Sequence, residues 1–138
     1  MAALIEIDNL VKEYPGVRAV DGISFAIAEG RCFGLLGPNG AGKTTTLEIL
    51  EGITEPDSGE ILFRGAMRDA AYRQAIGIQF QHTALPDFQT VDEALRLFAS
   101  FYIRHRPLAE LIELCNLGEL LQRDTRKLSG GQRQRLLL

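Results

Sequence analysis

The chain has 138 residues, 46% of them hydrophobic, and a formal net charge of −3. This length is enough for one globular domain that buries about two thirds of its unfolded surface, and the charge gives no electrostatic reason to expect a nucleic-acid partner. No apolar run approaches the roughly 18 residues that cross a bilayer, and the N-terminal residues show no signal peptide, so we expect a cytoplasmic protein.

The first half of the sequence alternates short strand patterns with turns. We predict strands at 4–10, 23–27, 31–36, 60–63 and 76–80, a helix at 43–50 and a short helix at 68–74. The strand at 31–36 is expected to be buried. Cys32 and Cys115 lie in apolar patterns without a Cys-x-x-Cys pairing, so we expect two buried free thiols.

Between the strand at 31–36 and the helix at 43–50, the sequence fits the Gly-x-x-x-x-Gly-Lys-Thr phosphate-binding pattern at every required position. Glycines let such a loop turn back, so that backbone N–H groups and the positive end of the following helix point at a phosphate. Lys43 is expected to reach the terminal phosphates of a nucleotide, and Thr44 to bind Mg²⁺. The expected nucleotide-binding residues of the loop are Gly37, Pro38, Asn39, Gly40, Ala41, Gly42, Lys43, Thr44 and Thr45.

Two other interpretations of this loop are weaker. A glycine-rich turn that merely connects two elements would not need all eight positions to match in a strand-to-helix context. A dinucleotide-binding Gly-x-Gly-x-x-Gly pattern would begin at Gly40, but Thr45 occupies its third glycine position. The pattern therefore favours binding of a nucleoside triphosphate.

The spacing of the apolar residues changes at Thr90. Thr90 and Glu93 form a capping-box pattern that opens a helix. Pro107 suits the first position of a second helix, which runs to about Asn116 and ends by Gly118. The middle third is therefore predicted to be a helical subdomain attached to a β-rich base.

A second motif, Leu-Ser-Gly-Gly-Gln-Arg-Gln-Arg, occupies residues 128–135. Ser129 suits a helix N-cap, Gln132 completes a capping box, and Gly130 and Gly131 leave bare N–H groups at the helix start. Such a start is a second candidate anion site. Together with the phosphate loop, this motif resembles the ATP-binding subunits of ABC transporters over essentially the whole chain.

The resemblance implies an α/β fold. It consists of a P-loop NTPase (RecA-like) core with an antiparallel β subdomain and a helical subdomain, and the C-terminal part of the core is missing from this chain. The implied boundaries are about 1–80 for the β subdomain and phosphate-loop core, about 81–128 for the glutamine loop and helical subdomain, and 129–138 for the start of the signature helix.

The resemblance also implies partners. In a head-to-tail dimer with a second nucleotide-binding subunit, ATP bound to one subunit is covered by a segment of the other, formed by Ser129, Gly130, Gly131 and Gln132. Transmembrane permease subunits are the other implied partners, and they would hold the protein at the inner face of the cell membrane.

Further site residues follow from the same resemblance. Tyr14 matches the aromatic residue that stacks on adenine, with Val20 packing nearby. Gln81 matches the glutamine that reaches Mg²⁺ and the attacking water, and it is preferred over Gln79 because it follows the predicted strand. Gln81 and Lys43 are thus the expected catalytic residues, and Thr44 and Gln81 the expected metal ligands.

The family pattern is incomplete at the C-terminal side. In this family the two carboxylates needed for ATP hydrolysis end a strand after the signature helix, whereas the present sequence stops at Leu138. We therefore expect no hydrolysis by these 138 residues alone. The strand at 31–36 would also lack its neighbours, and a bare apolar edge favours aggregation or marginal stability.

The sequence leaves three functions open. The leading one is an ATP-binding component that couples MgATP binding and hydrolysis to transport across a membrane. The alternatives are a soluble ABC-type ATPase that takes no part in transport and a non-catalytic nucleotide-binding fragment. The lack of a long insertion between Gln81 and Arg104 favours the transporter.

Overall fold

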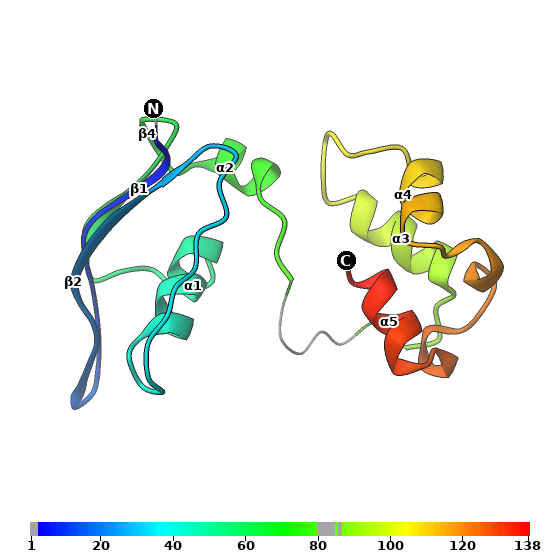
Figure 1. Ribbon diagram of the computed structural model, residues 1–138, viewed down its shortest axis with the longest axis horizontal. Coiled ribbons are helices and arrows are strands. Elements are labelled where there is room, and N and C mark those ends of the chain that lie inside the picture. Colours follow the sequence, from blue (N-terminus) through cyan, green and yellow to red (C-terminus); the bar gives the residue numbers. More distant parts are fainter. Residues whose placement is uncertain (1–2, 80–84, 86) are drawn as a thin grey trace. The chain divides into compact units, whose positions relative to one another are not determined.

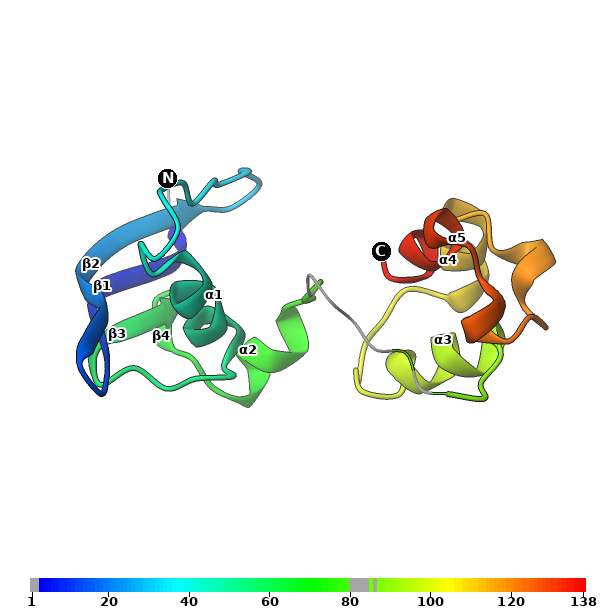
Figure 2. The ribbon, with the colours of Figure 1, turned by 90° about the horizontal axis from the view of Figure 1, so that it is seen from below.

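A computed structural model describes residues 3–79, 85 and 87–138 of the chain. The chain divides into two compact units, Met1–Ile76 and Gly77–Leu138. The first, here called the sheet unit, contains a β-sheet with α1 and α2, and the second, here called the helical unit, contains α3, α4 and α5 (Figures 1 and 2).

The sheet unit is built on four antiparallel strands in the order β2-β1-β3-β4. The sheet curves around α1, which lies against one of its faces (Figures 1 and 2). The elements of this unit are β1 (Ala3–Tyr14), β2 (Val17–Ala28), α1 (Lys43–Glu51), β3 (Ser58–Phe63), β4 (Ala66–Met67) and α2 (Ala70–Ala75).

The core of the sheet unit lies between α1 and the sheet. Its buried side chains are Ile7, Leu10, Val20, Ile49 and Ile61. Ile7 and Leu10 would face opposite sides of a regular strand because they are three residues apart. The pairing of β1 with β2 is irregular between these two residues, and Asn9 has a φ of 47°, so both side chains reach the core.

Both strands of the first hairpin are longer than the alternating pattern predicts. The predicted strands at 4–10 and 23–27 are confirmed, but β1 continues to Tyr14 and β2 already begins at Val17. The turn between them is Pro15 and Gly16, a dipeptide typical of turns. Most of the added residues are exposed and Val20 is buried, so these residues show no regular apolar alternation that would predict a strand.

Two predicted strands are wrong. Residues 31–36 and the described residues 76–79 belong to no strand. Their apolar runs fit a buried strand, but a strand also requires a partner for its backbone, and no described segment pairs with them. Leu36 is consequently 92% exposed, while Phe33 stacks on Phe25 of β2 with ring centroids 5.0 Å apart.

The prediction that both cysteines are buried is also wrong. Cys32 is exposed, because the segment that carries it is not covered by neighbouring strands. Cys115 is partly buried and packs against the core of the helical unit.

The helical unit has its own apolar core. Val91, Leu117 and Leu120 are buried there, and partly buried side chains of α4 and α5, including Ile112 and Leu136, pack against them. The elements of this unit are α3 (Val91–Ala99), α4 (Leu108–Leu114), two short 3-10 helices (Gly118–Leu120 and Thr125–Lys127) and α5 (Gly130–Leu136).

The helix start predicted at Thr90 is confirmed, and the start predicted at Pro107 is displaced by one residue. Thr90 Oγ1 accepts a hydrogen bond from Glu93 N at 3.2 Å, and Glu93 Oε2 accepts one from Thr90 N at 2.8 Å, which makes the predicted capping box. Pro107 directly precedes the first residue of α4 rather than being that residue. Because these signals are local in sequence, they could be recognised without any knowledge of the tertiary structure.

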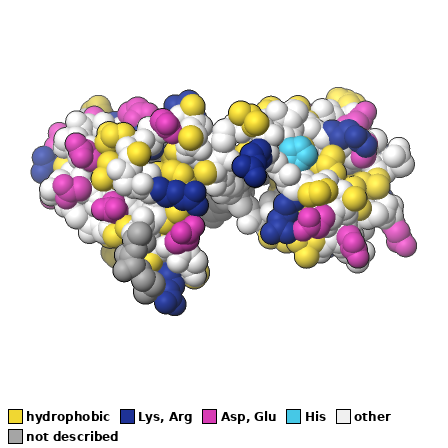
Figure 3. Space-filling model, turned by 90° about the horizontal axis from the view of Figure 1, so that it is seen from above, with side chains coloured by type: hydrophobic (Ala, Val, Ile, Leu, Met, Phe, Trp, Pro, Cys, Tyr) yellow, Lys and Arg dark blue, Asp and Glu magenta, His cyan; other side chains and the backbone are white. Residues whose placement is uncertain are grey.

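Charged side chains of both signs are interspersed over the face of the molecule drawn in Figure 3. Several form exposed ion pairs, such as Arg18–Asp21 in β2 and Arg96–Asp92 in α3. Such pairs contribute about 0–1 kcal/mol each, so the stability of each unit depends mainly on its apolar core. None of the helices formed by the described residues has both the length and the apolar character needed to cross a bilayer.

Candidate phosphate-binding site

The predicted phosphate loop enters α1 through a glycine that no other residue can replace without strain. Gly42 is the N-cap of α1 and has a φ of 81°, a left-handed conformation that favours glycine. A Cβ atom at this position would lie 2.0 Å from the backbone oxygen of Ala19 in β2. The loop is therefore in direct backbone contact with the β1–β2 hairpin.

The start of α1 carries no side-chain cap and no acidic residue in its first turn. Thr46 N and Thr46 Oγ1 both donate to the Gly42 carbonyl oxygen at 2.8 Å, and Thr46 is only 2% exposed. The N–H groups that precede Thr46 in the first turn have no carbonyl partner within the helix. This arrangement leaves donors and the positive end of the helix dipole available to an anion.

The Lys43 ammonium group lies over the loop. Its Nζ atom donates to the carbonyl oxygens of Gly37 and Pro38, both at 2.7 Å. The loop itself is tightened by a turn in which Ala41 N donates to Pro38 O at 3.2 Å. A phosphate bound here would compete with these two carbonyl groups for the lysine, as a charged acceptor forms the stronger hydrogen bond.

Most of the other predicted loop residues on either side of Lys43 are exposed to solvent. Asn39, Gly40, Ala41 and Thr44 are exposed, and Thr45 is partly buried. Thr44 therefore presents an accessible hydroxyl group in the first turn of α1, where the predicted Mg²⁺ ligand should lie. Among the described residues, no three His, Cys, Asp or Glu side chains come together as a metal site.

The second motif forms the start of α5. Ser129 Oγ accepts from Gln132 N at 3.3 Å and Gln132 Oε1 accepts from Ser129 N at 2.9 Å, so the predicted capping box is confirmed. Gly130 and Gly131 are exposed, and a Cβ atom on either one would meet no other atom within 4 Å. The segment thus presents bare backbone next to two side chains, each of which accepts a hydrogen bond from the backbone N–H of the other residue.

A match to a known protein family extends over most of the chain. A family model described as ABC transporter matches residues 20–138, a range that includes both the phosphate loop and the segment at the start of α5. The chain belongs to the ABC transporter family. The resemblance that the two motifs predict is therefore confirmed.

Curated relatives of this ABC family member include proteins from importers and from exporters. The sulfate/thiosulfate import ATP-binding protein CysA of Bradyrhizobium diazoefficiens is 40% identical over 97% of this chain and 42% of that protein. The Nod factor export ATP-binding protein I of Ralstonia nicotianae is also 40% identical, over 96% of this chain and 44% of that protein. The chain thus spans less than half the length of these relatives.

Solved structures of ABC ATPase subunits share the fold. A structure described as the ATP binding subunit of an ABC transporter has a TM-score of 0.85 and 28% identity, and covers 97% of this chain and 59% of that one. The protein cbiO1 of Clostridium perfringens, part of the ABC transporter complex cbiONQ, has a TM-score of 0.79 and 27% identity, over 99% and 60% of the two chains. The predicted α/β P-loop NTPase fold is therefore confirmed.

The residues predicted to contact the base lie on the β1–β2 hairpin. Tyr14 ends β1 and is 43% exposed, so part of its ring is accessible. Val20 is only 3% exposed and belongs to the core, and its Cγ2 atom lies 3.5 Å from the place of a Cβ atom on Gly42. Val20 accordingly joins the hairpin to the phosphate loop and offers little surface of its own to a ligand.

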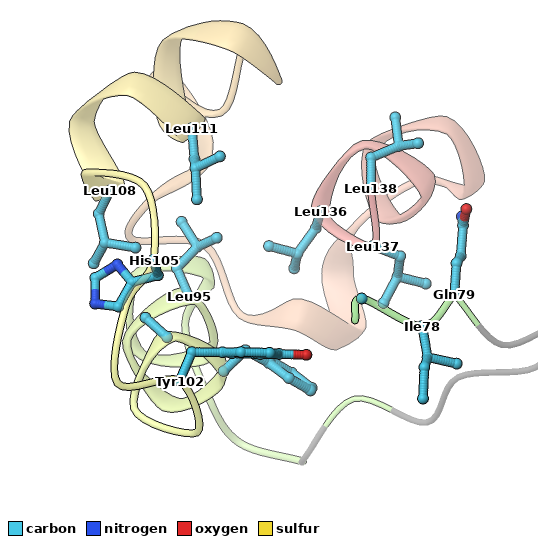
Figure 4. Close-up of a pocket in the computed structure, with 13 residues that line it drawn as sticks. Ile78, Gln79, Leu95, Tyr102, His105, Leu108, Leu111, Leu136, Leu137 and Leu138 are labelled. Carbon is cyan, nitrogen blue, oxygen red and sulfur yellow. The ribbon is translucent and has the colours of Figure 1, made fainter. Parts of the chain in front are cut away.

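Gln81, the predicted catalytic glutamine and metal ligand of this ABC protein, lies outside the described residues. The competing candidate Gln79 is exposed and lies at the edge of a pocket of about 720 Å³ in the helical unit. Figure 4 shows Leu95, Leu111 and Leu136 projecting into this pocket. Its lining is mainly apolar and includes no residue of the phosphate loop.

Two residues that support the loop were not among the predicted site residues. Ala19 contributes its backbone oxygen to the contact with Gly42, and Thr46 fixes the Gly42 carbonyl through its hydroxyl group. The hydroxyl contact follows a known local pattern, in which Thr in a helix bonds to the carbonyl four residues earlier. The Ala19 contact has no local signal, because it depends on how the hairpin packs against α1.

Proposed function

We propose that the protein containing this chain is the ATP-binding component of a membrane transporter and couples MgATP binding and hydrolysis to substrate translocation. The observation that carries the proposal is the start of α1, which combines an uncapped first turn with a lysine held over the loop. Membership of the ABC transporter family supports the transport role.

In this proposal different residues of the loop bind different parts of the Mg²⁺-bound triphosphate. Backbone N–H groups of the loop between Gly37 and Thr45, except at Pro38, which has none, bind the phosphate oxygens, and the Lys43 ammonium group transfers its hydrogen bonds from the loop carbonyls to the terminal phosphates. Thr44 contributes its hydroxyl group to a Mg²⁺ ion that is otherwise bound by phosphate oxygens and water. Tyr14 stacks on the base, and Gln81 approaches the metal and the attacking water.

The segment Ser129, Gly130, Gly131 and Gln132 is proposed to contact ATP bound to a second nucleotide-binding subunit in a head-to-tail dimer. Its bare glycine backbone supports this role, because a neighbouring triphosphate could approach it closely. Permease subunits are the further proposed partners, and they would keep the protein at the cytoplasmic face of the membrane. The boundaries near residues 80 and 128 are proposed as the limits of the helical subdomain.

The proposal is tested by MgATP binding to the full-length protein and to its Lys43→Ala variant. We expect Lys43→Ala to weaken binding by at least about tenfold, because the charge-assisted bonds to the terminal phosphates are lost. Lys127→Ala is the matched control, since it removes the same charge from the helical unit. Isothermal titration calorimetry measures all three, and equal affinities of the wild type and Lys43→Ala would contradict the assigned site.

A further inference from the structure

One aspartate joins the end of β1 to the segment that leads into β3. Asp57 Oδ2 accepts a hydrogen bond from Glu13 N at 2.6 Å, and Asp57 Oδ1 accepts one from Lys12 Nζ at 3.2 Å. The backbone N–H of Asp57 donates to Val11 O at 2.9 Å. A single residue therefore holds three consecutive residues of β1, and these directly precede Tyr14.

At the end of β1, these bonds take the place of backbone pairing with β3. Pairing of β1 with β2 continues to Tyr14, but its pairing with β3 ends at Val11, which lies opposite Ser58. Beyond Val11, the edge of β1 that faces β3 would be left without a backbone partner. The Asp57 carboxylate covers this edge at Glu13, and a hydrogen bond to a charged acceptor is stronger than a neutral one.

Close approach of β3 to β1 brings Asp57 within reach. A Cβ atom on Gly59 would lie 2.5 Å from the backbone oxygen of Asn9, so only glycine fits between the strands at this position. The Asp57 carboxyl group has a pKa below its usual value, because it accepts bonds from the Glu13 backbone and from Lys12. It is therefore charged at neutral pH and able to hold both partners.

The same contacts reach the Tyr14 ring. Lys12 Nζ, which is held by Asp57, lies 5.6 Å from the centroid of that ring. This distance is within the range of a cation–π interaction. Tyr14 is thus constrained through its backbone neighbour Glu13 and through the cation beside its ring, and both constraints depend on Asp57.

We propose that Asp57 is a positioning residue for base recognition, which holds the β1–β2 hairpin so that the Tyr14 ring can stack on the nucleotide base. The inference rests on the proposed function, because it requires ATP to occupy the phosphate loop. Asp57 itself touches no part of the nucleotide in this account. Its effect is confined to the part of the affinity that the base contributes.

The test compares a ligand that has a base with one that lacks it. MgATP and magnesium tripolyphosphate are titrated calorimetrically into the full-length wild type, Asp57→Ala and Asp57→Asn. We expect Asp57→Ala to bind MgATP about fivefold more weakly, a part of the effect of losing a stacked base, and to bind tripolyphosphate like the wild type. Asp57→Asn keeps an oxygen for Glu13 N but loses the charge facing Lys12, so its effect should be smaller.

A double-mutant cycle with Tyr14→Ala separates positioning from a general structural role. If Asp57 acts through Tyr14, adding Asp57→Ala to Tyr14→Ala should leave the affinity for MgATP unchanged. Asp21→Ala is the matched control, because it removes an exposed carboxylate of the β1–β2 hairpin itself, the one bonded to Arg18 at 2.7 Å. It should leave the affinities for both ligands unchanged.

The outcomes distinguish this inference from the proposed function. Unchanged MgATP affinity in Asp57→Ala, an equal loss for both ligands, or full additivity with Tyr14→Ala would each overturn the positioning role while the wild type still binds both ligands. A wild-type protein that binds neither ligand would overturn the proposed function, and the positioning role with it.

Discussion

The two glycine-containing motifs of the chain open helices in opposite ways. At the start of α1, Gly42 provides no side-chain cap, and the Lys43 ammonium group bonds to the loop carbonyls. At the start of α5, Ser129 and Gln132 form a complete capping box. Among the described residues, no side chain caps the N–H groups at the start of the first motif's helix, whereas the second motif caps some of its N–H groups with its own side chains.

This difference shows how the backbone N–H groups at a helix start can remain available to a ligand. Capping by Ser, Thr or Asp stabilises a helix by typically about 1 kcal/mol, and the chain uses such caps at α2, α3 and α5. The start of α1 has no side-chain cap and therefore lacks that stabilisation. Its donors instead remain available to an external anion, which is what the proposed triphosphate site requires.

The largest effect is expected from Gly42→Ala. The added Cβ would be in a left-handed conformation and 2.0 Å from Ala19 O, so the loop and the hairpin would have to move apart. We expect the free energy of unfolding of the full-length protein to fall by roughly 3 kcal/mol or more. Urea denaturation followed by circular dichroism measures this change.

Gly40→Ala is the matched control for that experiment. Gly40 also has a positive φ, of 84°, but a Cβ atom there would meet no atom within 4 Å. Its cost should be limited to backbone strain of about 1–2 kcal/mol. Equal losses in the two variants would show that the contact with Ala19 has no energetic role.

A smaller effect is expected where a cap is removed. Thr90→Ala deletes the hydroxyl group that accepts from Glu93 N, and it should lower the free energy of unfolding by about 1 kcal/mol. Glu93→Gln is the control, because its side-chain oxygen can still accept from Thr90 N. A Thr90→Ala variant as stable as the wild type would mean that the capping box does not stabilise α3.

How far the sequence predicts the structure depends on whether each signal is local. The capping boxes at Thr90 and Ser129 and the start of α1 involve residues within four positions of one another, and all three are correctly predicted. The strand expected at residues 31–36 is wrong because a strand needs a partner from elsewhere in the chain. The Asp57 contacts were missed for the same reason, since they join residues 44 and 45 positions apart.

The smallest effect concerns acid stability of the helical unit. Hydrogen bonds from the Arg126 side chain and from the Arg126 backbone lower the pKa of the Asp124 carboxyl from 3.8 to about 2. A carboxyl whose pKa is lower in the folded state contributes stability above its unfolded pKa, and this contribution is lost as the pH falls from about 4 toward 2. The effect should be modest because Asp124 and Arg126 are exposed to solvent screening.

The loss of stability at low pH is tested by measuring the free energy of unfolding of the wild type and Asp124→Asn by urea denaturation between pH 2 and 5. The stability of the wild type should decline more steeply with decreasing pH than that of the variant. Asp92→Asn is the control, because it removes a carboxylate that is bonded to Arg96 in α3. Parallel pH profiles of the wild type and Asp124→Asn would contradict the assigned ion pair.

A crystal structure of the full-length protein with Mg²⁺ and a non-hydrolysable ATP analogue would show directly whether the loop before α1 binds the triphosphate. We expect phosphate oxygens within about 3 Å of the backbone nitrogens between Gly40 and Thr45, with Lys43 Nζ moved from the Gly37 and Pro38 carbonyls to the terminal phosphate. A triphosphate bound elsewhere, with Lys43 still bonded to both carbonyls, would contradict this expectation.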